Sequence, residues 1–172
     1  MAYSTLPIVA AGDVIRSSTW GNIARANEEY LFSGRPTDSD GGVAIAVTTT
    51  STTYAEMDAT NLKKSITVNN GRLLVVFSAY IVTDNVSTHK GYVTVYVDSV
   101  DIGDATYGIY TCYTNTARSF HWMKILTGLS VGAHEIKIMG KVENAAQTLR
   151  IGQTTVSAGS SYHPTVFDLL EV

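Results

Sequence analysis

The chain has 172 residues, of which 45% are hydrophobic and 16% charged, and its formal net charge is -3. This length suits one domain with a sizeable core. The abundance of Val, Ile and Tyr at low charge excludes an intrinsically disordered chain, and the acidic balance argues against a nucleic-acid partner bound through its phosphates. No apolar run approaches the roughly 20 residues of a membrane-spanning helix. Composition therefore predicts a soluble, β-rich domain that binds neither nucleic acid nor membrane.

Residues 1–41 differ from the rest of the chain and predict an arm, a short helix and a linker. Ser17 or Ser18 can accept a hydrogen bond from the free amides of a first helical turn, so we expect a helix from about Thr19. Gly34 ends it, and turn-forming residues fill 35–42. The candidate anchoring residues share one helical face: Trp20, Ile23, Asn27 and Leu31.

A helix this short is marginally stable in water unless its face is covered. Two interpretations stay open at this point. Either the face packs on the β domain of the same chain, or the arm anchors the protein to symmetry mates or to another protein.

Residues 42–172 read as successive strands without an intervening helix. The run 73–82 is apolar on both faces and is expected to be central in its sheet, as is the final strand. Asn69-Asn70-Gly71 predicts a hairpin between 64–68 and 73–82, and 92–98 is expected to close at Asp98-Ser99. This pattern predicts an all-β fold, an antiparallel jelly-roll β-sandwich. The expected strands are 44–48, 53–57, 64–68, 73–82, 92–98, 107–114, 119–126, 132–142, 147–151 and 165–172.

Cysteine usage limits how the domain can be stabilised. Cys112 is the single cysteine, so no intrachain disulfide and no thiolate metal cluster can form. Its strand-like surroundings lack the basic or helix-terminal setting of a reactive thiol, which predicts a buried, inert one. Stability is then expected from packing or from oligomerisation.

Catalytic and metal-binding patterns are missing from the sequence. The four histidines have no metal-ligand spacing, although His121 and His134 could meet across a sheet. Asp98, Asp101 and Asp104 lie close together on a turn; they could bind calcium, or they could be solvated turn carboxylates. No phosphate loop, nucleophile elbow or acid–base pair appears, so we expect no enzyme, no catalytic residue and no cofactor. The histidines are His89, His121, His134 and His163.

The stretch from Ile66 to Val172 resembles the jelly-roll heads of the tumour-necrosis-factor and complement-type superfamily and their counterparts in bacteriophage structural proteins. The segments that carry this resemblance are 68–77, 93–98 with 100–103, 129–136 and 167–172. Near the N-terminus, 12–15 and 20–22 are similar to a segment common in phage tail and fibre proteins. No collagen-like stalk is present, which favours the phage side.

The resemblance implies a non-enzymatic virion protein, either a capsid decoration or a tail spike or fibre component. Three heads would pack about a three-fold axis through aromatic and aliphatic side chains, for which Phe167, Leu169 and Tyr80 are the candidates. The arm would bind other virion proteins of the capsid or tail, and the head would contact a glycan of the host surface.

A carbohydrate-binding β-sandwich module is the alternative, because such sandwiches often present aromatic rings to sugars. The candidate glycan contacts are Tyr107, Tyr110, Tyr113 and Trp122. A glycan hydrolase is disfavoured because the sequence shows no suitable carboxylate pair.

Overall fold

The computed structural model describes residues 37–38, 42–84, 90–113, 115–153 and 164–172. The chain divides into two compact units, Met1–Pro36 and Thr37–Val172, and the fold described below is that of the second. The predicted helix with Trp20, Ile23, Asn27 and Leu31 lies outside the described residues, as do His89 and His163.

The described part of the second unit is built from strands, and no helix long and apolar enough to cross a membrane occurs among the described residues. The strands are β1 Thr37–Asp38, β2 Val43–Ala44, β3 Val47–Thr49, β4 Ala55–Glu56, β5 Lys63–Val68, β6 Arg72–Thr83, β7 Gly91–Val97, β8 Val100–Asp101, β9 Tyr110–Cys112, β10 Arg118–Thr127, β11 Gly132–Val142, β12 Leu149–Ile151 and β13 Pro164–Glu171.

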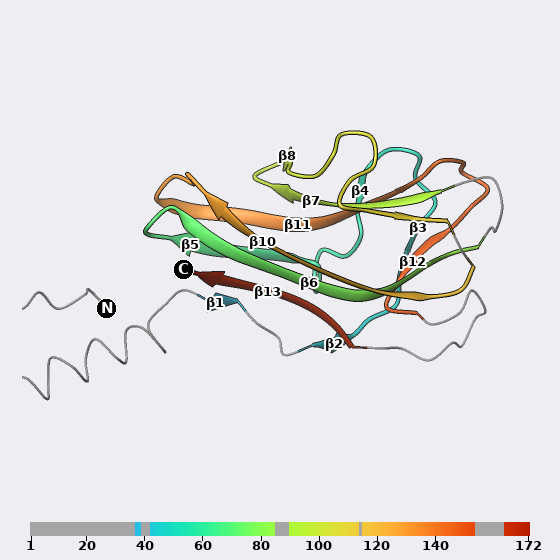
Figure 1. The fold of residues 1–172 in the computed structure, drawn as a ribbon, viewed down its shortest axis with the longest axis horizontal. Coiled ribbons are helices and arrows are strands. Elements are labelled where there is room, and N and C mark those ends of the chain that lie inside the picture. The colour runs from blue at the N-terminus through green and yellow to red at the C-terminus, as the bar shows by residue number, and fades with distance from the viewer. Residues whose placement is uncertain (1–36, 39–41, 85–89, 114, 154–163) are drawn as a thin grey trace, which may run out of the picture. The chain divides into compact units, whose positions relative to one another are not determined.

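One sheet has seven strands and is organised around the long strand β6. Strand β10 pairs with β6 along one side, and β13 and β12 pair with it along the other. Strands β1 and β2 pair with β13, and β3 pairs with β12. The predicted central positions of 73–82 and of the last strand are therefore confirmed (Figure 1). The stretch 44–48 forms two strands rather than one, because β2 and β3 pair with different neighbours.

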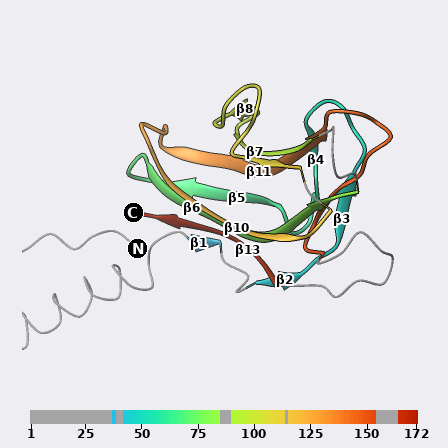
Figure 2. The same cartoon turned by 45° about the vertical axis from the view of Figure 1, so that its right-hand side comes forward.

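The other sheet has six strands and is organised around β11. Strands β5 and β4 pair with one side of β11, and β7 pairs with the other side and carries β8 and β9 on its far edge. All of these pairings are antiparallel. Figure 2 shows the two sheets as separate layers, with β11 and β7 in one and β6, β10 and β13 in the other. The prediction of an all-β antiparallel sandwich is thus confirmed.

The hydrophobic core fills the space between the layers. Every second residue of β6 from Leu73 to Ile81 is buried, as the period-two geometry of a strand requires. The Phe77 ring meets the rings of Phe120 and Phe167 edge-on, with centroids 6.2 and 6.4 Å apart. Cys112 is buried in this core, as its sequence context predicts.

The turn at Asn69-Asn70-Gly71 does not form the predicted hairpin. It joins β5, which belongs to the six-stranded sheet, to β6, which belongs to the seven-stranded one. The buried carboxylate of Glu171 accepts hydrogen bonds from the backbone amides of Asn69 and Asn70, so the turn is held by β13 instead of by a β5–β6 ladder. The sequence signal for a tight turn is correct, but the chain crosses between layers there.

The second predicted turn is confirmed. Asp98 and Ser99 have φ values of 48° and 72° and connect β7 to β8, whose residues Val97 and Val100 pair directly. A two-residue loop with positive φ at both positions has the geometry of a type I′ hairpin turn, which matches the twist of the flanking strands. Part of the expected linker is also ordered, since Thr37–Asp38 pairs with β13.

Candidate functional site

The outward face of the seven-stranded sheet carries an apolar patch on its three longest strands, next to polar positions that include Ser78, Ser119 and His121. Because the alternate residues of β6 and β13 fill the core, the residues between them point away from it. The register places Leu74 beside Ile125 and Leu170. We call this surface the apolar sheet face; its residues are Leu74, Val76, Met123, Ile125, Val166 and Leu170.

Exposure is highest on the β10 side of the apolar sheet face, where Met123 is 73% and Ile125 49% exposed. Asp168 is the charged residue that interrupts the face between Val166 and Leu170. Among the described strands, β10 pairs with β6 alone, so its other edge has no strand partner.

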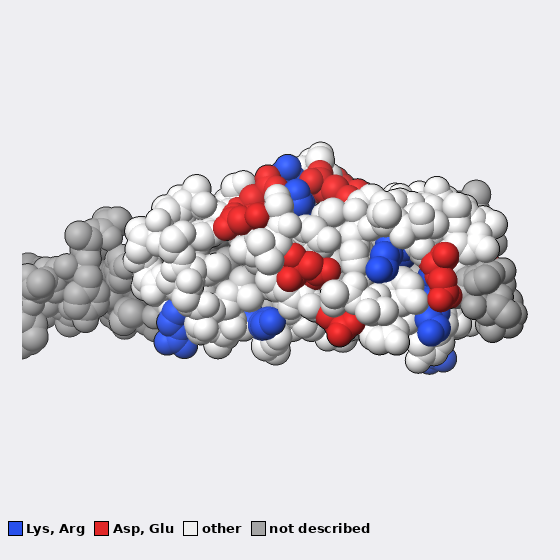
Figure 3. Space-filling view, turned by 90° about the horizontal axis from the view of Figure 1, so that it is seen from above, with Lys and Arg blue, Asp and Glu red and all other residues white. Residues whose placement is uncertain are grey.

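The outward face of the six-stranded sheet has the opposite character. Lys63 and Lys137 form ion pairs with Glu135 at 2.9 and 3.0 Å, and Glu56 lies within 3.6 Å of Lys63. Figure 3 looks onto this side and shows acidic and basic side chains distributed over it. A sandwich normally buries one face of each sheet and hydrates the other. The six-stranded sheet follows that rule and the seven-stranded sheet departs from it.

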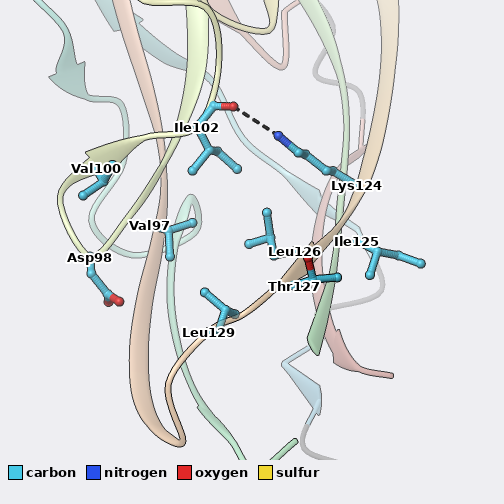
Figure 4. A pocket seen from close by; sticks show the side chains of 9 residues that line it. All are labelled: Val97, Asp98, Val100, Ile102, Lys124, Ile125, Leu126, Thr127 and Leu129. Carbon is cyan, nitrogen blue, oxygen red and sulfur yellow. Dashed lines mark hydrogen bonds between the residues drawn. The ribbon is translucent and has the colours of Figure 1, made fainter. Parts of the chain in front are cut away.

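An apolar groove continues the apolar sheet face at the edge of the sandwich. It lies between the β7–β8 hairpin and the end of β10 and has a volume of about 440 Å³. In Figure 4 the side chains of Val97, Ile102, Leu126 and Leu129 approach one another across it, and Lys124 reaches over to donate to the backbone oxygen of Ile102 at 3.3 Å. Ile125 lines this groove as well, which makes the two surfaces continuous.

The structure places the three candidate interface residues in two different settings. Phe167 and Leu169 are buried in the core of the single chain, because their positions on β13 point inward beside Phe77 and Val75. Their side chains are therefore already covered without a second subunit. Tyr80 lies on the outward side of β6, next to Ser119 in register.

Sequence reasoning missed the residues of the apolar sheet face. A usable signal was present: the run 73–82 is apolar on both faces, and Met123 and Ile125 are apolar at alternate positions of the β10 strand. What the sequence could not supply was the register that gathers these positions into one surface.

The four glycan-contact candidates are distributed over three places. Tyr110 and Tyr113 line one pocket of about 400 Å³ together with Thr111, Arg118 and Ser119. Tyr107 packs against Tyr92 with ring centroids 6.4 Å apart. Trp122 is half-buried against the core and lines a smaller pocket with Phe77, Ser78 and Met123.

The three turn aspartates do not gather into one site. Asp98 binds His134, Asp101 accepts from the Thr94 hydroxyl and the Gly103 amide, and Asp104 accepts from the amides of Thr106 and Tyr107. Each carboxylate is thus used in local hydrogen bonds. In the part of the chain that the structure describes, no group of three or more His, Cys, Asp or Glu residues is placed to hold a metal ion.

The two described histidines lie on different sheets and do not meet. His121 sits between the hydroxyls of Ser78 and Ser119, at 2.7 and 2.8 Å from its ring nitrogens. His134 is buried with Nδ1 2.6 Å from Asp98 Oδ2 and Nε2 2.8 Å from the backbone oxygen of Ser130. The Ser130 carbonyl and the Asp98 carboxylate raise the pKa of His134 above its usual value.

No protein-family model matches the chain, and a search of curated proteins finds no matching relative. What is established is an antiparallel two-sheet β-sandwich with charged residues on one outer face and an apolar patch on the other.

Proposed function

We propose that this chain is a non-enzymatic structural protein of a bacteriophage virion, a homotrimeric capsid decoration or tail spike or fibre component with a jelly-roll head. The observation that carries the proposal is the apolar sheet face. Water-exposed apolar patches rimmed by polar residues mark surfaces that bind other proteins. Identical chains that share such a face cover it by associating around a symmetry axis.

The energetics of the face favour association. Fully burying a Leu, Ile or Met side chain contributes about 1.5–3 kcal/mol. Covering the parts of Met123 and Ile125 that are still exposed contributes roughly 2–4 kcal/mol for each chain. The flanking positions Leu74, Val76 and Leu170 add to this. The hydrated six-stranded sheet then forms the outside of the assembly.

The cysteine usage and the N-terminal arm also fit a structural protein of a virion. The single cysteine is buried, so no disulfide reinforces the sandwich. Contacts between subunits supply an alternative source of stability, since binding the folded state alone raises its apparent stability. In this proposal the arm, with Trp20, Ile23, Asn27 and Leu31, attaches the head to other virion proteins of the capsid or tail.

Sedimentation of the full chain tests this proposal. The wild-type chain should sediment at three times its 18.5 kDa mass, and the double variant Met123→Lys/Ile125→Lys should sediment at one chain mass. The matched control is Ser65→Lys/Thr67→Lys, which places two lysines at exposed outward positions of β5 and should stay trimeric. A double variant on β10 that remains a folded trimer contradicts the use of this face. Absence of the chain from purified phage particles contradicts the virion assignment.

The head also contacts the host surface in this proposal, as a glycan-binding element. The specific observation in its favour is the pocket that brings Tyr110 and Tyr113 together with Arg118. A carbohydrate-binding module outside a virion is the alternative function, and the same pocket would serve it.

A further inference from the structure

We propose that the pocket lined by Tyr110, Thr111, Tyr113, Arg118 and Ser119 binds a sugar that carries a carboxylate, of the uronic or sialic acid class. Its volume of about 400 Å³ falls in the range of small-ligand sites, which suits one or two sugar rings. The inference deepens the host-contact part of the proposed function and does not depend on trimer formation, because a single chain supplies all five residues.

One wall of the pocket is preorganised. The ring of Tyr110 packs on Phe120 with a centroid separation of 4.4 Å and an interplanar angle of 35°. Its strand β9 is held by pairing with β7, where Tyr110 lies opposite Val93, and by the burial of Cys112 in the core. Because the ring is already fixed, binding a ligand against it costs little conformational entropy.

Tyr113 supplies an open aromatic surface at the same place. It follows directly after β9 and is 65% exposed. Tyrosine has an apolar ring with a polar tip, so it can cover the C–H face of a pyranose and bond to a ring hydroxyl at once. Two tyrosines on one pocket therefore favour a sugar over a purely apolar ligand.

Arg118 determines the charge of the ligand. The exposed Arg118 guanidinium has no carboxylate of the described residues at ion-pair distance. It shares this with Arg72 and Lys124, but among the described cations Arg118 is the one that lines this pocket. Among the described residues, no Asp or Glu lines the pocket. A planar guanidinium binds a carboxylate through two parallel hydrogen bonds, which selects an acidic sugar over a neutral one.

Two hydroxyl groups complete the lining. Ser119 Oγ lies 2.8 Å from Nε2 of His121, which orients that hydroxyl at the start of β10. Thr111 Oγ1 lies 3.5 Å from the backbone oxygen of Tyr107. Hydroxyls both donate and accept, so they can meet the hydroxyls of a sugar ring in either sense.

Ligand-observed NMR and calorimetric titration of the full-length chain with four free monosaccharides test the proposal. N-acetylneuraminic acid and glucuronic acid should bind, and galactose and glucose should bind at least tenfold more weakly. Loss of one charge-assisted pair at a solvated site corresponds to about a tenfold weaker affinity, so Arg118→Gln should weaken the acidic sugars by about that factor. Tyr113→Ala should weaken all binding.

The matched control is Arg72→Gln, which removes an exposed arginine at the other end of β6 and should bind as the wild type does. Equal affinity for acidic and neutral sugars, or an equal loss in Arg118→Gln and Arg72→Gln, overturns the proposal. A chain that sediments as a trimer but binds neither acidic sugar overturns this inference alone and leaves the proposed assembly standing.

Discussion

Replacing His134 with Gln should remove a pH-dependent contribution to stability. His134 is 5% exposed, and both of its ring nitrogens face acceptors, the carboxylate of Asp98 and the backbone oxygen of Ser130. Both nitrogens must therefore carry protons for both bonds to form, which makes the bound ring an imidazolium. The ring connects the β7–β8 turn to the loop before β11.

The direction of the effect follows from the pKa shifts. Hydrogen bonds to Ser130 and Asp98 raise the pKa of His134 above its usual 6.5. A raised pKa gives a contribution that is fully present below pH 6.5 and is lost as the pH rises through the folded-state pKa. Burial acts to raise the pKa of Asp98, but bonds from the Glu135 amide and from His134 outweigh it and hold it below its usual value. Asp98 therefore stays ionised across neutral pH.

The size of the contribution follows from the exposure of the pair. Hydrogen bonds to charged groups contribute about 1.5–3 kcal/mol, and solvent screening reduces this where a partner is exposed. The Asp98 side chain is 46% exposed, so we expect about 1–2 kcal/mol.

Urea unfolding between pH 6 and pH 9, at fixed protein concentration and followed by tryptophan fluorescence, measures this contribution. The wild type should lose about 1–2 kcal/mol of unfolding free energy relative to His134→Gln as the pH rises. His121→Gln is the control, because that exposed ring contacts two serine hydroxyls and no carboxylate of the described residues. Its unfolding free energy should change with pH as that of the wild type does. Parallel pH profiles of the wild type and His134→Gln would show that the His134 imidazolium does not stabilise the fold.

Two further substitutions test the packing between the layers. Phe77→Ala removes a fully buried ring that contacts Phe120 and Phe167. It should lower the unfolding free energy measured by chemical denaturation by about 3–5 kcal/mol. A loss below about 1 kcal/mol would contradict the described core. Glu171→Ala leaves the backbone amides of Asn69 and Asn70 without their acceptor. It should lower the unfolding free energy by about 1–3 kcal/mol and speed hydrogen exchange at those two amides. Unchanged exchange would show that Glu171 does not hold the turn.

Strands with a clear apolar pattern were predictable from the sequence. The bounds of β11 were predicted at Gly132 and Val142 because apolar and polar residues alternate along it, and β6 was predicted within one residue at each end because it is a continuous apolar run that follows the Asn70-Gly71 turn. The Asp98-Ser99 turn was predicted as well. Asp98 tolerates positive φ, and the β-branched and aromatic run 92–97 ends directly before it.

The partners of each strand, and the side of the sheet on which its side chains lie, could not be predicted in the same way. Asn70-Gly71 specifies a tight turn, but local chemistry does not say which sheet the next strand joins. Phe167 and Leu169 were assigned to the interface, although the register with Phe77 turns them inward and leaves Val166 and Leu170 outside. The pocket around Arg118 depends on β9 and β10 belonging to different sheets that meet at an edge, which is tertiary information.

The apolar sheet face is proposed to join identical chains, and sedimentation equilibrium of the wild-type chain and of Met123→Lys/Ile125→Lys measures this. We expect a mass of three chains for the wild type and of one chain for the variant, with unchanged β-sheet circular dichroism. A wild-type chain that stays monomeric at high protein concentration would contradict it.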